Sequence, residues 1–385
     1  MIIFSQSYGV LLLDSRAEIL ITDRVLSMAV KSSPIHFVVL LAMLSLAFPS
    51  SAHVPLMAGG NENISSAMHV SDPGKSWAVY GSLEKDAVAY YSFDLEAGER
   101  IYLSLFKSSD AIEEDFLPAL ALLGPGLNAS WQPPGQLALS LPGEASGLKI
   151  LAAYGKSAAG AVYEPFGPSS FKEIAEINIS APRSARYYAA VYSNSTNNNI
   201  AAGINGPKSP LGHYGLAVGY REESSFSERI TTPLRLISVY LWEGQSLGLI
   251  LIPYLVAEIL ALLFFWRGSR RTSFCLAGLL AGFFFLASSA SVFTQMVFNL
   301  TRAPFGPEVY ITAAIVVLHA FLGVAAIRLA RGEAGILQRV LLAVIGTLAL
   351  LAGSGLIMGP VLAVAASFLP SKSGSIFGTR AQEKN

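Results

Sequence analysis

Residues 247–266, LGLILIPYLVAEILALLFFW, are almost wholly apolar and decide the architecture of this chain. A helix of about 20 such residues crosses the hydrocarbon core of a bilayer. Three more apolar stretches follow, near Ser273–Phe298, Val309–Leu329 and Val340–Leu369. We therefore predict an α-helical membrane domain of about four transmembrane helices over residues 246–369, followed by a polar tail at 370–385. The last span exceeds the needed length, and we expect it to tilt or break at Gly359-Pro360.

The chain ahead of this region has a water-compatible composition. Charged residues are only 14% of the whole, below the usual share of about 25%, and most of them precede the spans. Residues 53–245 carry 19 acidic and 13 basic side chains, whereas residues 246–385 carry 4 and 10. A mildly acidic domain without a basic stripe excludes nucleic acid as a partner.

Residues 29–52, AVKSSPIHFVVLLAMLSLAFPSSA, have the three parts of a secretory signal. Lys31 supplies the positive start, an apolar run ends at Phe48, and small residues precede the cut after Ala52. We predict a signal peptide at 28–52 with translation starting at Met28, which makes residues 1–27 a non-native N-terminal extension. An N-terminal anchor that is never cut is the alternative.

Arginines predict the orientation in the membrane. The loops after the first and third spans are rich in arginine, whereas the loop after the second span has only Arg302. Positively charged loops stay in the cytosol, which predicts a multi-pass cell-membrane protein with an extracellular N-terminal domain. Four spans would also place the C-terminus outside, although Lys372, Arg380 and Lys384 in the tail favour the opposite side.

The exported domain shows the period-2 alternation of β-strands. Strands are predicted at 77–80, 87–93, 100–105, 117–123, 186–192 and 214–220. Short strands of this kind favour an all-β, jelly-roll-like sandwich, here over residues 53–225. Residues 226–245 form a juxtamembrane linker, which is either an amphipathic interfacial segment, a last strand or a plain connection.

Four segments of this domain resemble a known family. They are YYSFDLEAGERIYLSL at 90–105, FLPALALLGPG at 116–126, ARYYAAVYS at 185–193 and GHYGLAVGY at 212–220. In this order they resemble the bacterial pre-peptidase C-terminal (PPC) domain, a β-sandwich found beside secreted enzymes. The chain departs from the pattern through a long insertion at roughly 124–180 and has no peptidase domain. The resemblance implies a binding or accessory role and supplies no catalytic residue.

Two groups of side chains are candidate metal ligands. Cleavage after Ala52 would make His53 the N-terminal residue, whose amine and imidazole can chelate copper. His69 and His213 could complete such a site, or the three could be unrelated histidines, with His53 in a frayed terminus. Calcium is a second candidate, because acidic residues cluster in one loop that could equally be a solvated turn. That loop contains Asp110, Glu113, Glu114 and Asp115.

Glu258 and His319 lie near the middle of the first and third predicted spans. Ionisable groups at such depth are costly and often functional. A Glu258–His319 pair could relay a proton or tie two helices together, and we favour the tie because no further ionisable residue extends a path. Cys275, the single cysteine, is predicted to be a small packing residue.

Two kinds of short motif remain. Sequons for N-glycosylation occur at five positions on the predicted outer side: Asn63, Asn128, Asn178, Asn194 and Asn299. The tetrapeptide Pro-Phe-Gly-Pro occurs at 165–168 and again at 304–307. Both copies are expected on the outer side, where they could meet each other or share a partner, or be two turn-rich loops.

Hydrolase, phosphate-loop, dinucleotide and paired-zinc motifs are absent from the sequence. The leading hypothesis is a non-enzymatic, membrane-anchored surface protein whose β domain binds an envelope protein, a glycan or another membrane subunit. The alternative is a copper-handling or transport accessory protein using His53 or the Glu258/His319 pair. A third, a membrane enzyme, predicts a polar cavity around Glu258.

Overall fold

The computed structural model describes residues 53–84, 87–109, 116–128, 149–152, 154–155, 160–193, 212–269 and 271–371. The predicted signal peptide at 28–52, the extension at 1–27 and nearly all of the polar tail lie outside these ranges. So do Asn194 and the acidic cluster at 110–115.

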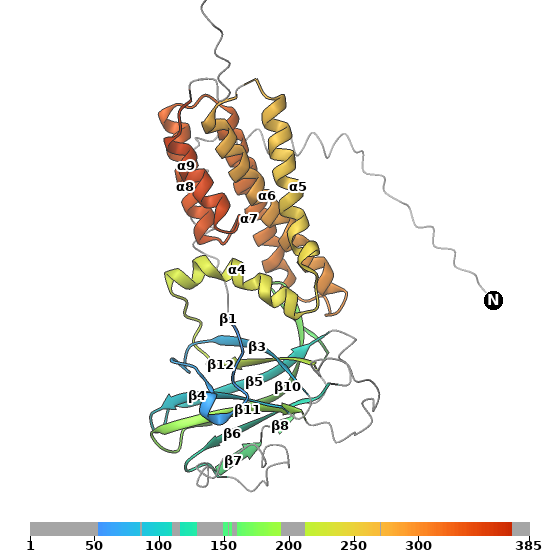
Figure 1. The fold of residues 1–385 in the computed structure, drawn as a ribbon, viewed down its shortest axis with the longest axis vertical. Coiled ribbons are helices and arrows are strands. Elements are labelled where there is room, and N and C mark those ends of the chain that lie inside the picture. Colours follow the sequence, from blue (N-terminus) through green and yellow to red (C-terminus); the bar gives the residue numbers. More distant parts are fainter. Residues whose placement is uncertain are drawn as a thin grey trace, which may run out of the picture.

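Two β-sheets pack face to face in the N-terminal part, called the β domain below (Figure 1). The first sheet has the order β1-β3-β12-β5-β10-β8, with β9 paired to β10. Its strands are β1 (Val54–Met57), β3 (Trp77–Leu83), β5 (Arg100–Ser108), β8 (Tyr154–Gly155), β9 (Val162–Glu164), β10 (Ser169–Ser180) and β12 (Gly212–Val218). Its neighbouring strands are antiparallel except β1 and β3, which are parallel.

The second sheet has the order β2-β4-β11-β6-β7. Its strands are β2 (Met68–His69), β4 (Val88–Leu95), β6 (Pro118–Gly124), β7 (Lys149–Ala152) and β11 (Ala185–Ser193). A short 3₁₀ helix, η1 (Ile64–Ser66), precedes β2. Apolar side chains of both sheets form one core, and across it the hydroxyls of Tyr91 and Tyr214 hydrogen-bond at 2.6 Å. Buried hydroxyls need such partners.

Each of the six predicted strands is confirmed, in β3, β4, β5, β6, β11 and β12. Residues 124–180 contain strand β10, which lies beside β5 inside the first sheet. Whether this stretch is an insertion relative to the PPC pattern stays a prediction. Strand β10 was not predicted because its apolar residues alternate with charged ones over a short stretch only. Ala175 and Ile177 face the core, while Glu173 and Glu176 lie on the other face of the sheet.

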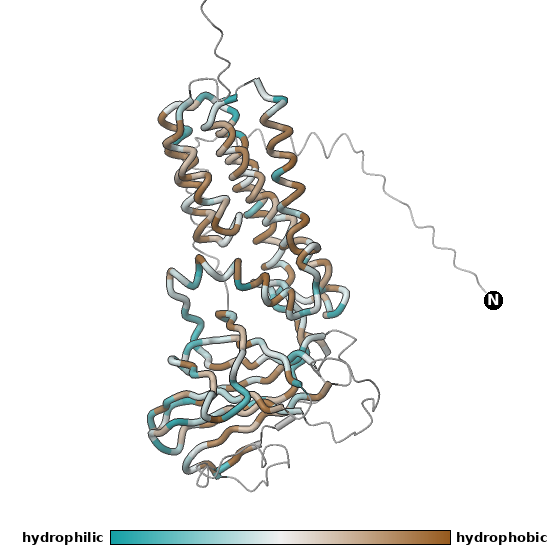
Figure 2. The backbone as a smooth tube through the Cα atoms, in the orientation of Figure 1, coloured by the Kyte–Doolittle hydropathy of each residue, from teal (hydrophilic) through white to brown (hydrophobic). Residues whose placement is uncertain are grey.

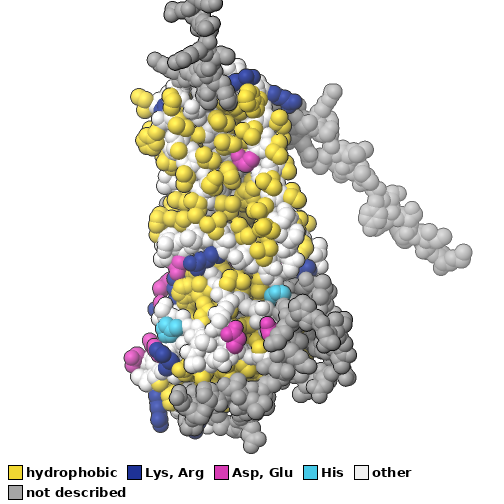
Figure 3. Space-filling view, viewed as in Figure 1, with side chains coloured by type: hydrophobic (Ala, Val, Ile, Leu, Met, Phe, Trp, Pro, Cys, Tyr) yellow, Lys and Arg dark blue, Asp and Glu magenta, His cyan; other side chains and the backbone are white. Residues whose placement is uncertain are grey.

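Six helices follow in the part described, and we call α5 to α9 the helical domain. They are α4 (Phe226–Trp242), α5 (Leu247–Arg267), α6 (Ser273–Leu300), α7 (Val309–Arg331), α8 (Ile336–Leu351) and α9 (Met358–Phe368). Among the described residues, α5, α6 and α7 are long and apolar enough to cross a membrane. The helices consist mostly of hydrophobic residues (Figure 2), and hydrophobic side chains cover the face of the helical domain seen in Figure 3, as expected of a membrane protein. The predicted amphipathic segment at 226–245 is helix α4, which runs across the end of the bundle near the β domain (Figure 1).

The prediction of one long fourth span at Val340–Leu369 was wrong. The chain forms two antiparallel helices, α8 and α9, joined by a non-helical turn at 352–357. Arg339 at the start of α8 donates to the carbonyls of Ser367 and Leu369 at the end of α9, at 2.7 and 2.8 Å. With 16 and 11 residues, these helices measure roughly 24 and 16 Å, too short to cross. The break precedes the predicted Gly359-Pro360, because proline is tolerated in the first turn of a helix.

This hairpin returns the chain to the end of the helical domain away from the β domain, called the distal end. The amide of Phe274, at the start of α6, donates to Pro370 O at 3.4 Å. The last described residues therefore lie beside the beginning of α6, at the distal end.

Cysteine labelling tests this path. In a Cys275→Ser background, single cysteines at Ser371 and Arg271 should react with a membrane-impermeant maleimide from the same side of a sealed vesicle. A cysteine at Ser227, in α4, should react from the other side. Labelling of Ser371 together with Ser227 would instead indicate a fourth crossing.

Candidate functional site around helix α4

Helix α4 lies between the first sheet and the helical domain (Figure 1). At its C-terminal end Trp242 packs edge-to-face on Tyr80, with ring centroids 4.9 Å apart. The indole of Trp242 also donates to the carbonyl of Gly81 at 2.9 Å. Only 5% of Trp242 is exposed, so this aromatic contact fixes one end of α4 on the β domain.

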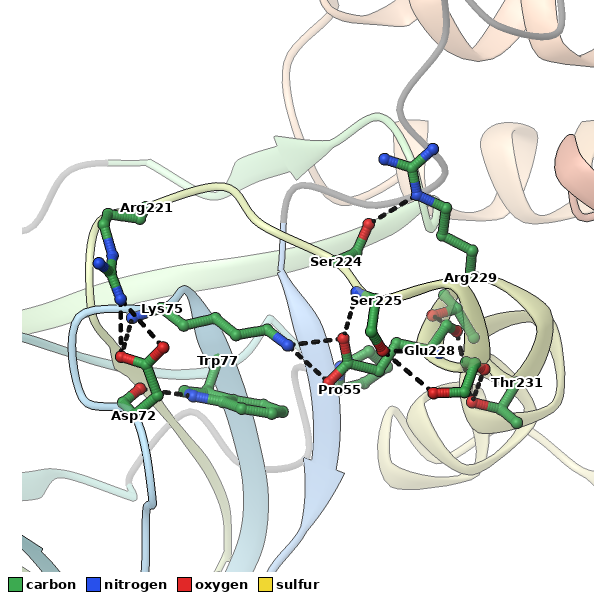
Figure 4. Close-up of polar contacts among 12 residues, drawn as sticks. Pro55, Asp72, Lys75, Trp77, Arg221, Ser224, Ser225, Glu228, Arg229 and Thr231 are labelled. Carbon is green, nitrogen blue, oxygen red and sulfur yellow. Dashed lines mark hydrogen bonds and ion pairs between the residues drawn. The ribbon is translucent and has the colours of Figure 1, made fainter.

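The N-terminal end of α4 is fixed by charge (Figure 4). Lys75 lies 2.6 Å from both carboxylate oxygens of Glu228 and 4.4 Å above the ring of Trp77. Glu228 also closes a capping box with Ser225. Although burial opposes ionisation, the hydrogen bonds from Lys75 and Ser225 hold the pKa of Glu228 below its usual value. One carboxylate therefore both starts the helix and attaches it to the sheet.

Buried polar groups join the two domains directly after α4. Glu243, 1% exposed, accepts from Ser170 N at 3.0 Å and from the amide of Gln245 at 3.1 Å. Gln245 and Gln295 of α6 form a reciprocal amide pair at 2.7 and 2.8 Å. We call Ser170, Glu243, Gln245 and Gln295 the junction network. Burial raises the pKa of Glu243 to about 8, with Arg302 among the groups that oppose the rise.

The first Pro-Phe-Gly-Pro segment, 165–168, lies on the helices beside this network. Asn299 of α6 donates to Pro168 O at 2.8 Å, and Thr312 of α7 donates to Pro165 O at 2.7 Å. Thr312 in turn accepts from the hydroxyl of Tyr163 at 2.9 Å. The segment is therefore the connector through which the β domain contacts α6 and α7.

A cavity of about 80 Å³ lies on the other side of α4. Its floor is formed by α4 with Thr232, Pro233, Leu236, Ile237 and Tyr240, together with Phe166 of the connector. Its walls come from α5, α6 and α7, and its roof is the α8–α9 turn, through Ala352, Gly353 and Leu356. We call this space the recess. Elements far apart in sequence thus converge on it.

Neutral polar side chains form the back wall of the recess. The hydroxyls of Tyr254 and Ser288 lie 3.1 Å apart, and Ser288 accepts from the backbone N–H of Gly355 at 2.7 Å. His319, 3% exposed, bonds through Nε2 to the carbonyl of Ala352 at 3.2 Å. A carbonyl only accepts, so Nε2 carries the hydrogen. Nδ1 of His319 has no hydrogen-bond partner within the described residues.

The roof of the recess has an unusual backbone. Gly353, Gly355 and Leu356 have φ values of 67°, 75° and 53°. Glycine adopts this region readily, whereas leucine does not. Ser288 and His319 hold the strained turn through its backbone N–H and C=O groups, so the recess and the turn depend on the same side chains.

The structure does not bring the three predicted copper ligands together. His53 precedes β1, where its Nδ1 bonds Ser76, whereas His69 lies in β2 of the other sheet. His213 lies opposite Ser82 in the first sheet and packs near Trp242. Over the described ranges, no group of three or more histidine, cysteine or acidic residues could hold a metal ion. The three histidines therefore lie on different strands, or beside them, in two different sheets.

Glu258 and His319 are also apart. His319 bonds to Ala352, and neither Oε1 of Glu258 nor Nδ1 of His319 has a hydrogen-bond partner in the described chain. Similar depth suggested the pair, but α6 packs against both α5 and α7 and separates their facing sides. The recess surrounds His319 rather than Glu258, and Cys275 is buried between helices as predicted.

Three of the predicted sequon asparagines are exposed: Asn63, Asn128 and Asn178. Asn299 is fully buried, and its amide nitrogen is occupied by Pro168 O and Gln295 O. Glycosylation there would require the end of α6 to rearrange. The second Pro-Phe-Gly-Pro, 304–307, stands free of the connector's hydrogen bonds, with Phe305 65% exposed.

Sequence reasoning missed the junction network and most of the recess wall. The available signal was polar residues inside apolar runs: Tyr254, Ser288, Gln295 and Asn299 lie within helices that are otherwise largely apolar. Such residues usually point to the interior of a bundle. Glu243 and Gln245 had no signal, because they sit in a polar linker.

Comparisons with known proteins bear on the β domain alone. No family model matches the chain, and no curated protein matches it. Among solved structures, it is similar to the pre-peptidase C-terminal domain of a collagenase from Bacillus anthracis, at 14% identity and a TM-score of 0.20. That match covers 39% of this chain and 91% of the other. The resemblance of the β domain to the PPC domain rests on the motifs quoted above, and no activity follows from it.

The raised pKa of Glu243 predicts how stability depends on pH. Between about pH 4.5 and 8 the folded protein holds a proton that the unfolded chain has lost, so stability should fall as pH rises through this window. The total loss should be roughly 3–5 kcal/mol at most. Glu243→Gln, which resembles the protonated acid, should flatten this dependence in thermal melts of the purified protein. An equally steep fall in the variant would show that another group is responsible.

Proposed function

We propose that this chain is a cell-surface membrane protein whose PPC-like domain is a non-catalytic binding or accessory domain, held in a fixed position outside the membrane. The observation that carries the proposal is the junction network. A β domain on a flexible tether needs no buried polar contacts with its anchor, whereas here Glu243, Gln245 and Gln295 are each 7% exposed or less. Such contacts form only in one relative orientation.

Arginine placement supports the orientation. Arg267, Arg271, Arg331 and Arg339 all lie at or near the distal ends of the helices. Positive residues favour the cytosol, so the β domain would face outward. The copper-handling alternative gains no support, because its three histidines lie apart.

A groove on the β domain is our candidate for the partner site. It has a volume of about 590 Å³ and combines acidic and basic side chains at one end of the sandwich. Two ion pairs line it, Asp94–Arg186 and Asp72–Arg221, each at 2.8 Å and each about half exposed. Exposed pairs contribute little to stability, so they are available to recognise a polar envelope protein or glycan.

A photo-crosslinking residue placed at Glu96, in the groove, tests this in cells. We expect one defined adduct, and Arg186→Glu should reduce it at least fivefold by reversing a charge in the site. Crosslinker at Glu62, an exposed position that does not line the groove, is the control. Equal adducts at both positions, or none at Glu96, would contradict the proposed partner site.

Spin-label distances test the fixed orientation. Labels at Met57 and Ser371, in a Cys275→Ser background, should give one narrow distance distribution in nanodiscs. Gln295→Leu leaves the buried amide oxygen of Gln245 without its donor, while the amide nitrogen keeps Glu243 as an acceptor. This loss costs roughly 1–3 kcal/mol and should broaden the distribution. Thr294→Val is the matched control, since that hydroxyl bonds Ala290 O of its own helix. A broad distribution in the unmodified protein would refute the fixed orientation.

A further inference from the structure

The outer face of the first sheet has a hollow where small side chains lie next to one another. Ala78 of β3 is opposite Ala217 of β12, and Ala217 is opposite Ser104 of β5. Their neighbours along each strand face the core, so these three point away from it. The next outward-facing residues on β3 and β5 are Tyr80 and Phe106, which carry large rings. A row of small side chains beside large ones leaves space above the sheet.

Helix α4 and the connector close this space into a pocket of about 110 Å³. Leu236 of α4 lies over it, together with Gly167 of the connector, where a Cβ would be 2.5 Å from Leu236 Cδ2. We call this space, with Ala217 at its floor and Leu236 above it, the sheet pocket. His53 and Glu164 also line it, and both are partly exposed, so the pocket opens at the surface of the protein.

The charged side chains that line the sheet pocket are acidic. They are Glu164 of β9 and Glu173 of β10, and the described lining contains no lysine or arginine. Two arginines near the pocket are held by other groups: Arg235 by the carbonyl of Pro55 at 3.2 Å, and Arg100 by a side chain of β10 at 3.0 Å. A concave site lined by carboxyl groups favours a cation over an anion.

Glu164 has an oxygen that no other group uses. Its Oε1 accepts from Phe166 N at 3.2 Å, and among the described residues Oε2 has no hydrogen-bond or ion-pair partner. Burial raises the pKa of Glu164 to about 7; the hydrogen bond from Phe166 opposes this rise and the negative charge of Glu222 adds to it. A cation bound beside Oε2 would lower the pKa again, because an opposite charge within about 4–6 Å stabilises the carboxylate.

Hydroxyls and aromatic rings form much of the remaining wall. The hydroxyls of Tyr80 and Ser104 have no hydrogen-bond partner in the part of the chain described, and each can accept from an N–H. The rings that line the pocket are those of Tyr80, Tyr102, Phe106 and Phe171. Ammonium groups are attracted to such rings. A carboxylate, two hydroxyls and several rings are together the surroundings that an alkylammonium ion requires.

We propose that the sheet pocket binds the ammonium group of a small soluble amine, with Glu164 as its counter-ion and Tyr80 and Ser104 as further acceptors. The volume of about 110 Å³ is roughly three quarters that of an engineered cavity that takes up benzene. An alkylammonium of about four or five heavy atoms therefore fills it. The sheet pocket shares no described lining residue with the groove, so this inference is independent of the partner proposed there.

Ligand-observed NMR of the full chain in phosphatidylcholine nanodiscs tests the site. The probe is propylammonium chloride, titrated at constant ionic strength to about 50 mM, because ligands this small bind with dissociation constants of roughly 0.1–10 mM. 1-Propanol, which has the same size and no charge, is titrated in parallel, and empty nanodiscs give the background. We expect saturable binding of propylammonium that is at least tenfold tighter than binding of 1-propanol.

Two variants change the sheet pocket in different ways. Glu164→Gln keeps an acceptor for Phe166 N and removes the charge, so it should lower the affinity for propylammonium at least tenfold and leave that for 1-propanol unchanged. Ala217→Leu fills the hollow and should remove binding of both. Glu62→Gln and Ala97→Leu make the same kinds of change at exposed positions outside the pocket and should have no effect. Thermal melts establish that each variant is folded, and either variant tests the site if the other is not.

Three outcomes would overturn the amine site. Equal affinities for propylammonium and 1-propanol in the unmodified protein would show that the charge is not recognised. Propylammonium binding that folded Glu164→Gln leaves unchanged would show that another group holds the cation. An absence of saturable binding at the highest concentration would show that the pocket takes up no amine. None of these results bears on the groove or on the fixed orientation, so a failure here is distinct from a failure of the proposed function.

Discussion

Non-helical backbone inside an apolar region must find hydrogen-bond partners within the protein, and the helical domain depends on this constraint. The turn at 352–357 is such a segment. Ser288 of α6 and His319 of α7 bind its N–H and C=O groups, and Gly355 is packed so closely on Phe285 that a Cβ would lie 2.6 Å from that ring. The polar side chains of the central helices therefore have a structural role before any other. Because the turn leaves a gap before α4, the same side chains also form a polar wall.

The connection between the domains follows the same constraint at the other side of α4. The segment between α4 and α5 carries the polar side chains Glu243 and Gln245 into a contact from which water is excluded. Glu243 is held by Ser170 and Gln245, and Gln245 by Gln295, so that strand β10, the linker and α6 share one set of hydrogen bonds. A buried carboxyl is costly, and the raised pKa of Glu243 shows that the site favours the neutral acid. Small losses here should affect orientation more than fold, because each domain has its own apolar core.

The sequence predicted local structure better than arrangement. Alternation identified six strands because their inward residues are apolar and their turns contain glycine, but it failed for β10, whose outward face is charged. Apolar length identified α5, α6 and α7, yet it could not distinguish one long span from α8 and α9, since both give one continuous apolar run. The Gly-Ser-Gly sequence at 353–355 lies inside this run, and such a sequence is compatible with a turn. The position of His319 in the middle of an apolar run correctly predicted that it lies inside the helical domain. Its partner depends on how α7 is rotated about its own axis, and this rotation is set by packing against neighbouring helices. In the structure His319 faces Ala352 and not Glu258.

The hairpin also removes a conflict in the charge distribution. Four spans would put Lys372, Arg380 and Lys384 on the same side as the β domain, against the tendency of positive residues to remain in the cytosol. With α5, α6 and α7 as the crossings, as their length and composition allow, the two ends of the helical domain would lie on opposite sides. Ser371 then lies at the end where Arg271 and Arg339 are found, and the basic tail starts from there. Arg302, between α6 and α7, lies at the other end, where it stacks over the ring of Phe298 at 4.4 Å.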